Sequence, residues 1–119
     1  LRDTLRYIEG TYEDKKVTIA LTDIFYIETV DRKTFAYTKD MSVEIKEALK
    51  DILEEYSKIG FARISKSVIV NIYKIKKLQG DINMRVIIFL KNDEKLIMNR
   101  SYKNDFYKRL NDLKGRSAK

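Results

Sequence analysis

Residues 61–75 carry the side chains of this chain that are best suited to contact a polyanion. Arg63, Ser65, Lys66 and Ser67 stand directly before an apolar run of valine and isoleucine. Cationic groups and hydroxyls bind phosphate oxygens and the edges of bases. Buried neighbours would hold the Ser-Lys-Ser segment in one fixed pose, which favours a nucleic-acid contact. The alternative is a basic loop between two core strands that binds no ligand.

Two other polar segments adjoin apolar strands in the same way. Arg32 and Lys33 end a polar connection, and Thr34 begins the strand that follows it. Asn99 and Arg100 stand at a corner between a predicted strand and the final helix, where a side chain projects from backbone that is held in place. We call these three segments, residues 32–34, 65–67 and 99–100, the polar corners. We expect the strands and helices on either side to position them.

The periodicity of apolar residues predicts those elements. Alternating or continuous apolar segments predict strands over residues 6–9, 17–21, 24–28, 34–38, 41–45, 73–79, 84–90 and 95–98. We expect a polar connection over residues 29–33 and an edge strand at 73–79, whose lysines deter pairing with other sheets. Helical spacing predicts two amphipathic helices, an acidic one over 49–56 that ends at Gly60 and one over 102–113 capped by Asn99 or Ser101. The fold class is therefore mainly β with two helices.

Composition restricts the chemistry that the chain can perform. With 119 residues and 44% apolar content, we expect one domain with a real core. The chain has no cysteine and no histidine, and its other polar residues form no recognisable catalytic set, so we expect no enzyme, no cofactor and no metal site. No apolar run reaches the roughly 20 residues of a membrane span, and the sequence begins without a signal-peptide pattern, which favours a cytoplasmic protein with no membrane partner.

Positive charge is concentrated in the second half of the chain. Residues 61–119 carry 15 Lys and Arg against 5 Asp and Glu, whereas residues 1–60 carry 10 against 13. A basic half on one domain indicates a polyanionic partner, with nucleic acid as the first candidate. The acidic helix at 49–56 should then face away from that partner. Further phosphate contacts are predicted at Lys74, Lys76, Lys77, Ser101 and Lys103.

The ordered set of these segments resembles the LytTR family of bacterial DNA-binding domains. The resemblance rests on residues 23–28 with Arg32 and Thr34, the acidic helix, residues 61–67 with 69–71, and Arg100-Ser101-Tyr102. It covers residues 5–113, the expected core of a domain over residues 1–119 that we expect to be part of a longer regulator. It implies an elongated fold of small antiparallel sheets. One departure is Ser65, where the family often has histidine.

The resemblance also implies a function. It predicts a transcription regulator that binds a specific sequence of double-stranded DNA by inserting loops into successive major grooves. The implied contact residues are Arg32, Lys33, Thr34, Ser65, Lys66, Ser67, Asn99 and Arg100. It further implies the output domain of a response regulator, behind a receiver domain, that dimerises on repeated half-sites. The alternatives are a β-rich domain that binds RNA or single strands, and a basic module that binds an acidic protein.

Overall fold

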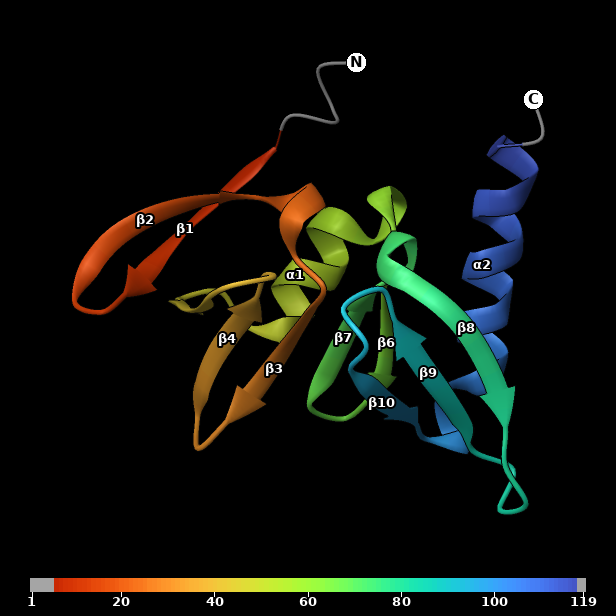
Figure 1. Ribbon diagram of the computed structural model, residues 1–119. Helices are drawn as coiled ribbons and strands as arrows, with labels where there is room; N and C mark the ends of the chain where they lie inside the picture. The colour runs from red at the N-terminus through yellow and green to blue at the C-terminus, as the bar shows by residue number, and fades with distance from the viewer. Residues whose placement is uncertain (1–5, 118–119) are drawn as a thin grey trace.

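The computed structural model describes residues 6–117 and places ten strands and two α-helices in them (Figure 1). Seven strands form one antiparallel sheet in the order β2-β1-β5-β4-β3-β7-β6, and three form a second in the order β10-β9-β8. The first sheet contains β1 (Tyr7–Tyr12), β2 (Lys15–Ala20), β3 (Tyr26–Val30), β4 (Lys33–Tyr37), β5 (Ser42–Ile45), β6 (Phe61–Ser65) and β7 (Val68–Asn71). The second contains β8 (Ile75–Gly80), β9 (Val86–Leu90) and β10 (Lys95–Met98). The predicted fold class, mainly β with two helices and antiparallel sheets, is confirmed.

Two hairpins differ from the sequence prediction because their turns are tighter. The β3–β4 turn consists of Asp31 and Arg32, with φ of 51° and 69°, as in type I′ hairpins. The predicted connection over residues 29–33 is therefore wrong, because the strands continue to Val30 and resume at Lys33. The β1–β2 hairpin is also longer than predicted. Its first strand continues through Gly10, where an added Cβ would collide with β5.

The second sheet confirms the predicted edge strand. β8 lies at the edge of the sheet and pairs only with β9, and the β9–β10 hairpin was also predicted. This hairpin turns between Leu90 and Lys95. Tyr26 links the two sheets, since its hydroxyl donates to Glu94 Oε2 at 3.3 Å. Burial, followed by the charge of Glu94, raises the pKa of this hydroxyl above its ordinary value.

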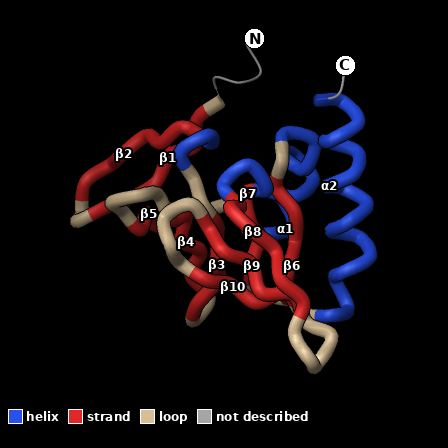
Figure 2. The backbone as a smooth tube through the Cα atoms, turned by 45° about the vertical axis from the view of Figure 1, so that its right-hand side comes forward, coloured by secondary structure: helices blue, strands red, loops and turns tan. Residues whose placement is uncertain are grey.

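Both predicted helices are present, beside the strands in Figure 2. α1 (Leu49–Tyr56) continues into a 3-10 turn (η3, Ser57–Ile59) and ends at Gly60, whose φ of 112° suits glycine. α2 (Lys103–Ser117) is preceded by a 3-10 turn (η5, Arg100–Tyr102). The predicted side-chain cap at Asn99 is wrong, because Tyr102 N donates to the backbone oxygen of Asn99 instead. Ser101 lies inside η5.

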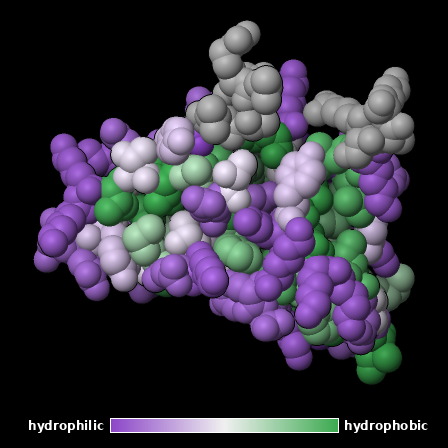
Figure 3. All heavy atoms as spheres, turned by 45° about the horizontal axis from the view of Figure 1, so that its top comes forward, coloured by the Kyte–Doolittle hydropathy of each residue, from purple (hydrophilic) through white to green (hydrophobic). Residues whose placement is uncertain are grey.

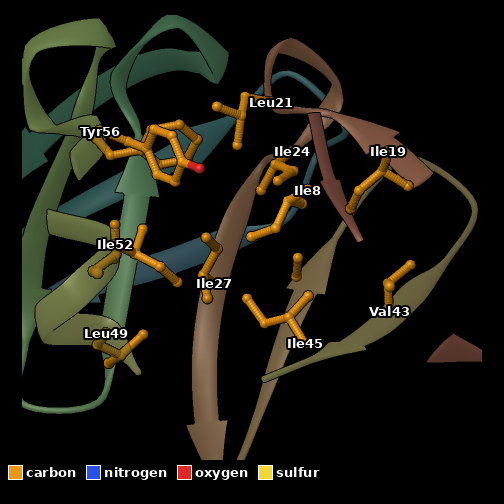
Figure 4. Close-up of a cluster of buried hydrophobic side chains, with 13 residues drawn as sticks. Ile8, Ile19, Leu21, Ile24, Ile27, Val43, Ile45, Leu49, Ile52 and Tyr56 are labelled. Atoms are coloured by element: carbon orange, nitrogen blue, oxygen red, sulfur yellow. The ribbon is translucent and has the colours of Figure 1, made fainter. Parts of the chain in front are cut away.

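Two hydrophobic cores meet at the β6–β7 hairpin. In the first core, Leu49 and Ile52 project from α1 toward Ile27 on β3 (Figure 4). Phe61 and Ile69 of the hairpin belong to this core. The second core lies between β8–β10 and α2, and it receives Ala62, Ile64 and Val70 from the same two strands. Alternate residues of one hairpin are therefore buried on opposite sides, which fixes the position of the turn between its strands.

Asn71 secures the far end of this hairpin. Its side chain is 4% exposed, donates from Nδ2 to Ile24 O at 2.8 Å and accepts from Tyr73 N at 3.0 Å. A short 3-10 turn (η4, Ile72–Lys74) follows it. Because an unpaired buried polar group costs about 1–3 kcal/mol, these two bonds favour one path for the chain from β7 into β8.

Candidate nucleic-acid interface

The three polar corners lie at one end of the molecule, the lower end in Figure 1. The β6–β7 turn, made of Lys66 and Ser67, is the central corner. On one side Thr29 N, in the β3–β4 hairpin, donates to Ser67 O at 2.9 Å. On the other side Asn99 N donates to Ile64 O at 2.9 Å. One backbone hydrogen bond on each side thus joins the corners, although they are far apart in sequence.

The central turn is held by Arg63. Its Nε donates to Ser65 O at 3.1 Å and its Nη2 donates to Lys66 O. Ser65 Oγ accepts from Ser67 N at 3.2 Å. Lys66 is exposed and Ser67 is half-buried. The turn therefore presents the Lys66 ammonium on rigid backbone, while two donor groups of Arg63 are used to hold that backbone.

The first corner presents fewer groups than the sequence predicts. Arg32 lies at the tip of the turn, and Lys33 is an exposed residue of β4. Thr34 was expected to project, but it is only 8% exposed. Its hydroxyl lies 3.4 Å from that of Thr29, its cross-strand partner. The prediction failed here because β4 already begins at Lys33, so Thr34 lies inside the paired strand and not in the turn.

The third corner is the passage from β10 into α2. Asn99 and Arg100 are both exposed, and Arg100 is the first residue of η5. Met98, directly before them, is fully buried in the second core. Ser101 is exposed and Lys103 half-buried in the turns that follow. Met98 anchors the backbone before Arg100, and Lys103 N donates to Arg100 O after it, so Arg100 projects from a fixed base.

Of the four lysines predicted to contact phosphates, Lys103 follows the third corner directly, whereas the other three lie outside the corners. Lys74 follows β7, so it lies at the opposite end of that strand from the Lys66 turn, and its Nζ lies 5.0 Å from the centre of the Phe25 ring. Lys76 pairs with Asp93 at 3.6 Å. Lys77 lies over the Phe89 ring at 4.5 Å. Each of these three side chains already has a partner within the chain.

The surface supports duplex binding better than it supports the binding of RNA or single strands. Phe89, the aromatic residue on the outer side of the second sheet, is covered by Lys77 and Lys95 at 4.5 and 5.4 Å, so it offers no open platform for stacking bases. Hydrophilic side chains cover much of the face in Figure 3, with hydrophobic atoms in separate patches. Residues 6–117 hold no group of three His, Cys, Asp or Glu suited to a metal ion. Within the same span, every helix is too short or too polar to cross a bilayer.

Comparison with known proteins decides the family. The family model for the LytTr DNA-binding domain matches residues 14–111. The chain belongs to this family. A LytTr domain is a DNA-binding domain of transcription regulators, and that is the class of this chain.

Two relatives agree with this assignment, and a solved structure shares the fold. Two Staphylococcus aureus proteins, from strains bovine RF122 / ET3-1 and NCTC 8325 / PS 47, are named HTH-type transcriptional regulators. Each is 31% identical over 100 residues, which cover 83% of this chain and 67% of the relative. The solved LytTr DNA-binding domain from Bacillus cereus superposes with a TM-score of 0.82 at 24% identity, covering 87% of this chain and 95% of that one.

The fold of this LytTr domain differs from what the relatives' name suggests. In residues 6–117, α1 and α2 are separated by all five strands from β6 to β10, so this part of the chain contains no helix-turn-helix. Its polar corners are turns between strands, or between a strand and a helix. DNA contact by this domain must therefore be explained without a recognition helix of that type.

Proposed function

We propose that this LytTr domain recognises a specific sequence of duplex DNA by placing its polar corners in successive major grooves. The observation that carries the proposal is the pair of backbone bonds that hold the three corners at one end. The domain measures 42 × 36 × 25 Å. One turn of B-DNA is about 34 Å long, so a domain of this length can extend across successive major grooves.

The proposal assigns different roles to the polar side chains in and beside the corners. Lys66 and Arg100 reach base edges, and Arg32 and Lys33 reach a second part of the site. Asn99 and Ser101 donate to bases or phosphates beside Arg100, and Lys103 contacts a phosphate. Arg63 acts through the turn that it holds. These roles follow from exposure and from the donors that each group keeps free.

The direct test is a competition experiment. A labelled duplex, selected from a random-sequence pool by the domain itself, is displaced with unlabelled duplex, with each of its single strands and with polyglutamate. We expect the matching duplex to compete at least ten-fold better than the other three. Equal competition by a single strand would favour the RNA or single-strand alternative, and equal competition by polyglutamate would favour the protein-binding one.

Lys66 is predicted to read sequence, and Lys74 supplies a matched control. Lys66→Ala should weaken binding to the selected duplex more than binding to an unrelated duplex. Lys74→Ala removes the same charge at the opposite end of β7 and should change neither affinity. Titrations of both duplexes at several salt concentrations measure this. If Lys74, Lys76 or Lys77 contacts a phosphate, its replacement lowers both affinities alike and reduces the salt slope by about one.

If Lys66→Ala and Lys74→Ala had equal effects on both duplexes, Lys66 would have no part in reading sequence. The binding would then depend on overall charge.

The proposal extends to the assembly. We infer from the family that two copies occupy repeated half-sites, that a receiver domain precedes this one in the full protein, and that the domain acts in the cytoplasm, where bacterial DNA lies. Titration of duplexes with one and with two half-sites tests the first inference, since pairing predicts tighter binding to the double site.

A further inference from the structure

An open hollow lies between two of the polar corners. The β3–β4 turn and the β6–β7 turn form two of its sides, and the start of α1 forms the third. Its volume is about 550 Å³. The buried Leu49 side chain and the threonines of β3 and β4 contribute to its lining. The two turns thus project on either side of a concave surface.

Four cationic residues line this hollow: Arg32, Lys50, Arg63 and Lys66. No Asp or Glu is among its lining residues. Within the described residues, the ion pairs involve other side chains, so none of these four forms an ion pair with a carboxylate. Like charges around one concave surface repel one another, and they concentrate positive potential there. The hollow is therefore suited to an anion.

This inference rests on the proposed function, and the shape of the hollow then indicates which anion it binds. If both turns enter grooves of a duplex, the surface between them must accommodate the ridge that separates grooves. That ridge is the sugar–phosphate backbone, which carries one negative charge per phosphate. We propose that the hollow seats a backbone phosphodiester and that Lys50 contacts it directly.

Lys50 is a new member of the interface. The sequence places it on the acidic helix, which was expected to face away from DNA. In the structure it is exposed in the first turn of α1, at the border of the hollow, whereas the acidic Asp51, Glu54 and Glu55 of the same helix do not line it. The helix thus turns one cation toward the hollow and its carboxylates elsewhere.

The test compares Lys50→Gln with Lys46→Gln. Lys46 is also exposed and lies just before α1, but it does not line the hollow. We expect Lys50→Gln to weaken binding to the selected and unrelated duplexes by the same factor and to reduce the salt slope by about one. The Lys46 variant should have the same duplex affinities and the same salt slope as the wild type. Thermal unfolding without DNA checks folding, and we expect Lys50→Gln to be at least as stable as the wild type because it relieves repulsion.

The outcomes separate this inference from the proposed function. A wild-type salt slope for folded Lys50→Gln, in a domain that still prefers its selected duplex, would overturn the phosphate site and leave the proposed function intact. If the wild-type domain itself showed no preference for duplex over single strands, the proposed function would be refuted instead.

Inorganic phosphate distinguishes a DNA phosphate from a free anion. Titration of phosphate into the wild-type domain should move the amide signals around the hollow only weakly, without saturation in the millimolar range. Saturable binding of phosphate there, with duplex affinity unchanged, would make the hollow an anion site separate from DNA and would overturn the inference.

Discussion

Arg100→Ala is expected to weaken binding to the selected duplex by about 1–3 kcal/mol and to remove preference at one base pair. Arg100 is exposed, and its backbone is fixed by the Asn99–Ile64 hydrogen bond before it and by the bond from Lys103 N to its own carbonyl oxygen after it. A guanidinium is a planar fork of donors that matches the O6 and N7 acceptors of guanine. The backbone therefore has little conformational freedom left to lose on binding, and only the side chain must be ordered. Titration against the selected duplex and against single-base variants measures both effects.

Arg100→Lys distinguishes a base contact from a phosphate contact. Lysine keeps the charge but has no planar fork, so we expect it to leave the specific affinity near that of Arg100→Ala. Full recovery with lysine, or the same loss on every duplex, would show that Arg100 holds a phosphate. Because Arg100 is exposed, neither substitution should alter the thermal unfolding of the domain.

The second large effect is expected at Arg63, for a different reason. Arg63→Lys should lower affinity for the selected duplex about ten-fold while leaving the salt slope unchanged. Its guanidinium donates to the backbone oxygens of Ser65 and Lys66, and an ammonium cannot make both bonds from the same position. The charge remains, so contacts that depend on charge alone should persist, whereas the turn loses the pose that aims Lys66.

Arg109→Lys is the matched control for this substitution. Arg109 pairs with Asp105 along α2, away from the three corners, so the variant should bind like the wild type. The amide signals of Lys66 and Ser67 provide a readout without DNA, and they should broaden or shift in Arg63→Lys alone. A variant with unchanged turn signals that loses the same affinity for the selected and for unrelated duplexes would mean that Arg63 contacts a phosphate itself.

Much of the fold could be predicted because burial leaves a periodic pattern. Apolar residues at spacings of two, or of three and four, located most strands and both helices. The hairpin turns were harder, because Asp31 and Arg32 adopt positive φ without the glycine or asparagine that usually indicates such turns. Gly10 was interpreted as the end of a strand, whereas it allows β5 to approach β1 closely.

The candidate site could be predicted only in part, for a similar reason. Its polar corners could be recognised, since each adjoins an apolar segment. Their meeting depends on bonds between residues far apart in sequence, such as Thr29 with Ser67, which no local pattern reveals. Sequence also cannot show that Arg63 holds its own turn, that Thr34 is buried, or that Lys50 borders the same hollow as Lys66.

The central claim is that three corners form one surface for duplex DNA. It is tested most directly by following the amide signals of the labelled domain as the selected duplex is added. We predict the largest changes at Arg32 and Lys33, at residues 65–67 and at residues 99–101, all at the same ratio of DNA to protein. Changes centred on the outer face of β8–β10, or on the Lys74 end of β7, with the three corners unaffected, would contradict it.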